Sequence, residues 1–96
     1  MLEPPHVVSY NGKTFEHRRA GEVVLRWKRV RRASSYVIDQ TTDVRTPASW
    51  TRTGMSTKAK AYVDGLTSGT RYWFRVAAVS AAGQGAWSEA VAGVAG

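Results

Sequence analysis

The sequence predicts an all-β domain, either a β-sandwich or a small barrel, and two patterns carry this prediction. Short runs rich in β-branched and aromatic residues alternate between apolar and polar positions, and turn signals separate these runs about every ten residues. No segment keeps a sustained helical period. With 96 residues and no cysteine, the chain suffices for one small domain, whose core must hold it together without disulfides.

The expected strands share this alternation of apolar and polar residues. They are HVVSY (6–10), EVVLRWK (22–28), SYVIDQTT (35–42), SWTRT (49–53), KAKAYV (58–63), a long strand within GTRYWFRVAAVSAAGQGAWSE (69–89), and WSEAV (87–91). The turn dipeptide Asn11–Gly12 follows the first strand, so KTFEH (13–17) is expected to return as an added short strand. Gly54 is expected to end the fourth of these segments.

Several residues in these strands occur at a specific spacing. A Trp lies on the second main strand and a Tyr on the third. A Leu then stands six residues before a Tyr that opens an alternating apolar strand, and a Gly-containing loop leads to a final strand with a Ser. The residues are Trp27, Tyr36, Leu66, Tyr72, Phe74, Val76, Gly83, Gly85 and Ser88. This pattern resembles the fibronectin type III domain over nearly the whole chain.

The resemblance implies a seven-stranded, immunoglobulin-like antiparallel β-sandwich with fibronectin type III topology. It divides the chain into a lead-in at 1–5, the sandwich at 6–92 and a flexible tail at 93–96. It places Tyr72 at a tyrosine corner, with its hydroxyl turned back to the backbone near Leu66. The residues expected in the structural core are Trp27, Tyr36, Leu66, Tyr72 and Phe74.

The sequence contains no grouping with convincing catalytic spacing, so we expect no enzyme activity and no cofactor, although an accessory role in a larger enzyme is compatible with it. The histidines are His6 and His17, which would face each other across the expected hairpin. No further metal ligand suggests itself, so we interpret both as solvated side chains. Asp39, Asp43 and Asp64 are scattered and form no close pair for acid–base chemistry.

The charge of the chain favours polyanionic partners. Fourteen Lys and Arg against seven Asp and Glu give a net charge of +7. In the topology that the resemblance implies, the strands at 22–28 and 58–63 are neighbours, and their alternation puts cations on one outer face. These are Arg26, Lys28, Lys58 and Lys60, with Arg18 and Arg19 as an extension. Two interpretations stay open: a solvated face that blocks edge pairing, and a binding face for acidic glycan or nucleic acid.

The other sheet is expected to present an aromatic outer face. If Tyr72 and Phe74 point inward, the pleat of the strand turns Trp73 and Arg75 outward. The candidate residues of this face are Trp50, Trp73, Arg75 and Trp87. Two interpretations stay open here as well: a local cation–π stack that covers its own sheet, and a platform for a protein or sugar partner.

These observations together predict a non-catalytic spacer or adhesion-type interaction module of a larger protein, with polyanion binding as the alternative and carbohydrate binding on exposed Trp as the third reading. We expect neighbouring domains of a longer chain as partners, a monomer in isolation, and no membrane insertion, because no apolar window approaches the ~18 residues of a membrane helix. The resemblance favours a bacterial or phage origin and a secreted, cell-surface or phage-particle location. The opening residues, MLEPPHVV, lack the features of a secretory signal.

Overall fold

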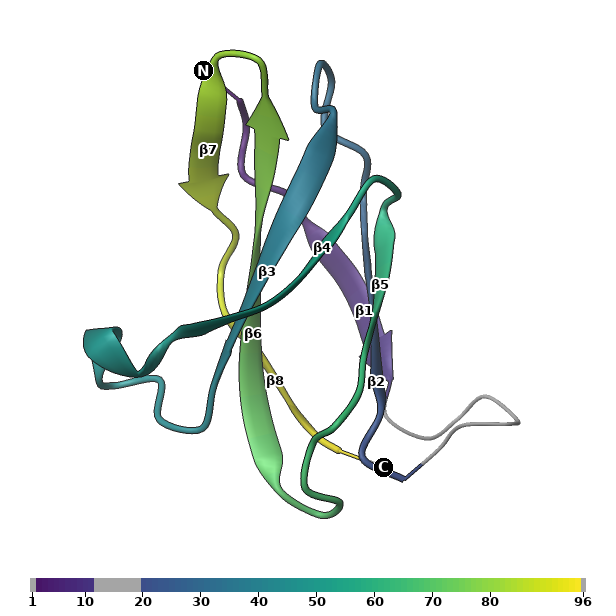
Figure 1. Cartoon of the computed structure of the whole chain (residues 1–96), viewed down its shortest axis with the longest axis vertical. Helices are drawn as coiled ribbons and strands as arrows, with labels where there is room; N and C mark the ends of the chain where they lie inside the picture. Colours follow the sequence, from purple (N-terminus) through teal and green to yellow (C-terminus); the bar gives the residue numbers. More distant parts are fainter. Residues whose placement is uncertain (1, 12–19, 96) are drawn as a thin grey trace.

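Strands in two antiparallel sheets make up the computed structural model of the protein, which describes residues 2–11 and 20–95 (Figure 1). In chain order the elements are β1 (Val7–Asn11), β2 (Val23–Trp27), β3 (Ser35–Thr41), the 3-10 helix η1 (Pro47–Ser49), β4 (Thr51–Ser56), β5 (Lys60–Val63), β6 (Arg71–Ser80), β7 (Gly83–Trp87) and β8 (Val91–Val94). Over these two ranges, no helix is long and apolar enough to cross a membrane. The expected turn at Asn11–Gly12 and the strand at 13–17 lie outside the described residues.

The two sheets face each other as a sandwich. One has the strand order β1-β2-β5, and the other has the order β4-β3-β6-β7 with β8 also paired to β6. β7 pairs with the second half of β6, from Ala77 to Ser80, whereas β8 pairs with its first half, from Arg71 to Phe74. β7 and β8 therefore lie along the same edge of β6 and together take one strand place in the sheet, and the prediction of a seven-stranded antiparallel β-sandwich is confirmed.

The expected strand at 87–91 is wrong, because the chain breaks between β7 and β8. The backbone N–H of Ser88 donates to the carbonyl oxygen of Val76 (2.7 Å), and the N–H of Val76 donates to Ser88 Oγ (2.9 Å). The serine hydroxyl thus accepts a bond that a backbone carbonyl accepts in a regular ladder. β7 ends at Trp87 for this reason, and β8 begins only at Val91.

Two further boundaries differ from the expectation. Gly54 does not end its strand: β4 continues to Ser56, and the pairing with β3 shifts register between Ile38 and Asp39, which lets the chain pass the glycine. The flexible tail expected from residue 93 is also not what the structure shows. β8 runs to Val94, and Ala95 is buried, with its N–H donating to the carbonyl oxygen of Thr70 (3.0 Å).

Strand alternation builds the core between the two sheets. Val23, Leu25 and Trp27 on β2 point inward and are at most 3% exposed. They meet the inward side chains of β3 and β6, and the core cluster includes all five residues for which burial was expected: Trp27, Tyr36, Leu66, Tyr72 and Phe74. Phe74 and Ile38 have no exposed surface, as a close-packed interior requires.

Two tyrosine hydroxyls tie loops to this core. Tyr72 OH accepts a hydrogen bond from the N–H of Thr67 (2.8 Å), one residue past Leu66, which is the tyrosine corner that the resemblance implied. Tyr36 OH accepts one from the N–H of Val30 (2.8 Å), in the loop between β2 and β3. Each buried ring therefore fixes a loop as well as filling space.

We expect the tyrosine corner to be measurable as stability. Replacing Tyr72 by Phe leaves the N–H of Thr67 without its acceptor and should cost about 1–3 kcal/mol, whereas Tyr72→Ala also removes the ring and should cost about 3–5 kcal/mol. Thr67→Ala keeps the backbone donor and serves as the control, with an effect within about 0.5 kcal/mol. Urea unfolding of the three variants gives these values, and a neutral Tyr72→Phe would show that the corner contributes nothing.

Candidate functional site

The acidic and histidine side chains that could support chemistry do not converge. Among the described residues, no group of three or more His, Cys, Asp or Glu could hold a metal ion. His6 is exposed, and His17 lies outside the described ranges. Asp43 stabilises a turn: its carboxylate accepts bonds from Thr46 Oγ1 (2.6 Å) and from the N–H of Arg45 (3.2 Å), and these bonds lower its pKa below the usual 3.8.

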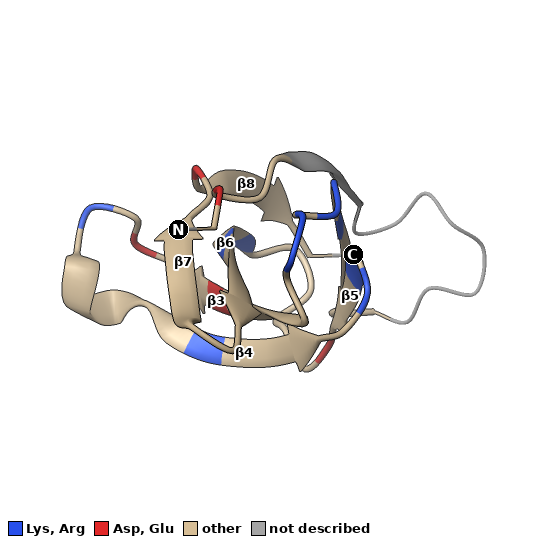
Figure 2. Ribbon diagram, turned by 90° about the horizontal axis from the view of Figure 1, so that it is seen from above, with Lys and Arg blue, Asp and Glu red and all other residues tan. Residues whose placement is uncertain are grey.

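The expected basic face forms on the outer side of the β1-β2-β5 sheet. The antiparallel register places Arg26 of β2 directly opposite Lys60 of β5. One residue further along this strand pair, the N–H of Trp27 donates to the carbonyl oxygen of Ala59 (3.0 Å). Lys28, just after β2, and Lys58, before β5, therefore lie at the same end of the pair. We call Arg26, Lys28, Lys58 and Lys60 the basic face, and Figure 2 shows Lys and Arg gathered on the β5 side of the sandwich.

The basic face brings like charges together, which is unfavourable unless water or an anion separates them. Lys28 and Lys58 are exposed, whereas Arg26 and Lys60 are half-buried. The ammonium of Lys60 lies 5.3 Å from the centroid of the Tyr62 ring, where a cation–π contact holds it along the strand. The proposed extension by Arg18 and Arg19 falls on residues outside the described ranges.

An arginine between two indole rings dominates the outer face of the other sheet. The guanidinium carbon of Arg75 lies 4.4 Å from the centroid of the Trp50 ring and 4.2 Å from that of Trp87. β6 supplies the arginine, β7 supplies Trp87, and Trp50 follows η1. We call these three side chains the tryptophan–arginine stack. Both distances are within the range of cation–π contacts.

A buried carboxylate anchors the stack. Arg75 Nη2 donates to Asp39 Oδ2 (3.1 Å), and Arg52 Nε donates to Asp39 Oδ1 (2.8 Å). Asp39 lies opposite Arg75 on β6 and opposite Arg52 on β4, so one carboxylate bridges three strands. Its side chain is only 8% exposed. The sequence analysis predicted neither of these ion pairs, and it did not single out Arg52.

The partners of Arg75 differ in part from those expected. The sequence put Trp50, Trp73 and Trp87 on this face, with Trp73 as the expected neighbour of Arg75 and Trp87 as a further member of the stack. The structure puts Trp50 and Trp87 against the guanidinium, whereas Trp73 pairs with Thr41 and Ala92 further along β6. Each indole of the stack has one ring face turned to Arg75. That face is covered by protein and is not a surface on which a sugar ring can lie.

The two arginines that pair with Asp39 should contribute unequally to stability. Arg75→Ala removes a 26%-exposed partner of Asp39 together with the contact to both rings, and should cost about 3–5 kcal/mol. Arg52→Ala is the matched control, because it removes a partner whose side chain is 49% exposed, and it should cost about 1 kcal/mol or less. Chemical unfolding followed by tryptophan fluorescence measures both, and equal costs would show that Asp39 does not distinguish the two partners.

The structural comparisons agree on the fold. The fourth FNIII domain of a human protein is 20% identical, with a TM-score of 0.78 over 99% of this chain and 79% of that one. An Fn3-like protein from Clostridium thermocellum is 24% identical, with a TM-score of 0.68 over 76% of this chain and 75% of that one. The twitchin kinase region of C. elegans is 23% identical, with a TM-score of 0.75 over 94% of this chain; the chain spans only 16% of that protein's length.

The sequence comparisons give the family. A search of curated proteins gives no significant match. Domains of the kind found here occur as modules alongside others, as in the twitchin region and in titin kinase with its flanking domains. The family model for the fibronectin type III domain matches residues 6–94, which contain every strand described above. The chain therefore belongs to the fibronectin type III family.

Proposed function

We propose that the chain is a non-catalytic module that holds neighbouring parts of a larger protein at a fixed separation. The observation that carries this proposal is the position of its two ends. Leu2 packs beside Gly85 of β7, near the end of β6, and Ala95 is bonded to Thr70, just before β6 begins. β6 has ten residues and therefore spans about 33 Å. The two ends lie at opposite ends of the long axis in Figure 1.

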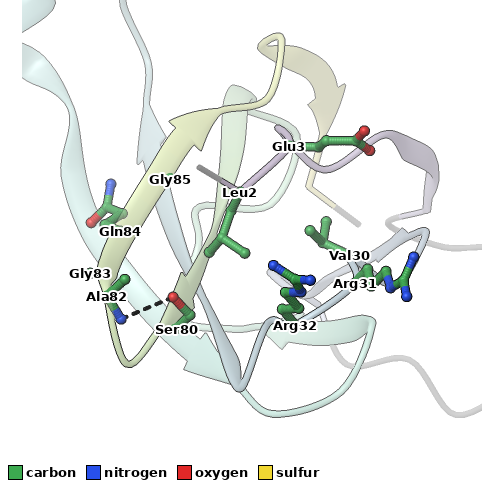
Figure 3. Close-up of a pocket in the computed structure, with 10 residues that line it drawn as sticks. All are labelled: Leu2, Glu3, Val30, Arg31, Arg32, Ser80, Ala82, Gly83, Gln84 and Gly85. Atoms are coloured by element: carbon green, nitrogen blue, oxygen red, sulfur yellow. Dashed lines mark hydrogen bonds between the residues drawn. The ribbon is translucent and has the colours of Figure 1, made fainter.

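Both ends are attached to the sandwich, which a spacer of defined length requires. At the far end, the N–H of Gly69 donates to the carbonyl oxygen of Ala95 (3.0 Å) in addition to the bond with Thr70. At the near end, Figure 3 shows the side chain of Leu2 pointing between the β6–β7 hairpin and the loop that carries Val30 and Arg32. A Cβ at Gly85 would lie 2.8 Å from Leu2 Cβ, so glycine makes room for this close approach.

A distance measurement tests the spacer directly. Because the chain has no cysteine, spin labels at Glu3→Cys and Val94→Cys report one distance by pulsed EPR, and both positions are exposed. We expect a single narrow distribution centred at about 30–35 Å. Adding Gly85→Val should broaden it, because a side chain there displaces Leu2, whereas Ala86→Val at the exposed neighbouring position should not. A broad distribution in the parent sequence would contradict a fixed spacer.

Polyanion binding through the basic face is a second candidate, supported by the direct pairing of Arg26 with Lys60. Four cations on or beside two adjacent strands create a positive field that would attract an acidic glycan or a nucleic acid backbone. The chemistry is electrostatic, so affinity should fall steeply with salt as counterions are released. The four cations would contact the charged groups of the polyanion, so we expect no base-specific contact.

NMR amide shifts against heparin and a short DNA duplex, at low and at about 200 mM salt, test this candidate. We expect salt-sensitive shifts centred on the basic face that disappear in a Lys58→Glu, Lys60→Glu variant. An Arg45→Glu, Arg71→Glu variant carries the same change in charge at exposed positions away from this sheet, and it should retain most of the binding. Unchanged spectra at low salt would remove the candidate and leave the spacer.

A further inference from the structure

A groove opens between the two sheets where each has an edge. β4 ends the order β4-β3-β6-β7, and β5 ends the order β1-β2-β5, so each pairs on one side only. Ser56 closes one end of the groove, because its hydroxyl donates to the carbonyl oxygen of Lys60 (2.7 Å). From this turn the strands diverge, as Figure 1 shows. The hollow between them has a volume of about 450 Å³.

The floor of the groove is apolar because one strand lacks a side chain there. Gly54 lies opposite Ile38, which faces the core, so a side chain at position 54 would point between the sheets. A Cβ built on Gly54 meets nothing within 4 Å. Ala61 and Val63 of β5 line the opposite wall. The missing side chain therefore leaves an open apolar space about as wide as one residue.

The rim of the groove combines exposed apolar side chains with positive charge. Met55 is 68% exposed and Tyr62 is 54% exposed, and both are among the large apolar residues left at the surface. Lys58 and Lys60 stand beside them, and none of the described residues that line the groove is acidic. An occupant must therefore offer carboxylates to the rim and an apolar side chain to the floor.

We propose that the β4–β5 groove binds an extended acidic peptide segment of another protein. The segment pairs with the free edge of β4, puts an apolar side chain into the space over Gly54, and puts carboxylates beside Lys58 and Lys60. Strand addition at an edge supplies backbone hydrogen bonds, and alternate side chains supply the selectivity. An acidic glycan satisfies only the lysines, because the apolar floor offers it nothing. This inference does not depend on the spacer role.

Gly54 gives an unusually clean test. Gly54→Val puts a side chain into the groove at a point where an added Cβ meets nothing within 4 Å, and strands favour valine, so folding should be retained. The probe is a synthetic peptide that alternates Glu with Val. When the peptide is added, we expect amide shift changes in the protein at residues 51–56 and 60–63. The affinity for the peptide should fall at least about tenfold in Gly54→Val. Thr57→Val adds an apolar side chain at an exposed turn position outside the groove and should leave binding unchanged.

Further measurements distinguish the contribution of charge from the identity of the molecule in the groove. Lys58→Gln with Lys60→Gln should weaken binding of the peptide, and a Lys–Val peptide should not bind. If oligoglutamate or heparin binds as tightly and ignores Gly54→Val, the attraction is purely electrostatic and the proposal is overturned in favour of the basic face. Concentration-dependent shifts in β4 without peptide would identify a second copy of the chain as the occupant and would equally overturn it.

Discussion

The register of β6 is the constraint on which the other features depend. Its inward side chains, Tyr72, Phe74 and Val76, are buried in the core, while Arg75 between them points to the outer face. A slip of one residue would put the guanidinium into the core and three apolar side chains into water. β3 on one side of β6, and β7 with β8 on the other, are aligned to this register. The core and the tryptophan–arginine stack are thus two faces of one strand.

The tryptophan–arginine stack follows from this register, because the carboxylate of Asp39 needs cations opposite it. Asp39 is 6% exposed, and a buried carboxylate is costly unless cations and hydrogen bonds compensate it. Pairing puts Arg75 and Arg52 opposite it on two different strands, so the compensation depends on all three strands being in place. The rings of Trp50 and Trp87 then lie against the guanidinium and cover part of it. Because both ion pairs form only in this register, they favour this alignment of the three strands over a shifted one.

Alternation within strands and the resemblance to the fibronectin type III domain together predicted the core, and cross-strand geometry explains what they missed. Alternation separated the two faces of the strand that carries Trp27, and the resemblance set the inward position of Phe74, from which pleating orients its neighbours. The ion pairs of Asp39 require knowing which residues stand opposite each other, and alternation carries no such information. Gly54 was interpreted as a stop because glycine usually breaks strands, but a register shift in the pairing with β3 accommodates it. The break at Ser88 likewise depends on a bond to Val76 on the neighbouring strand.

The arrangement of surfaces limits where a partner could be recognised. At the two ends of the long axis, contacts of Leu2 and Ala95 hold the ends of the described chain against the sandwich. The outer face of the β3–β6 pair is engaged in its own stack, since Arg75 covers a face of each indole. The side that carries β5 differs from both, because like charges converge there and an edge of each sheet is unpaired. Like charges brought close together and unpaired edge backbone both gain from a partner, so both binding proposals place the partner on this side of the sandwich.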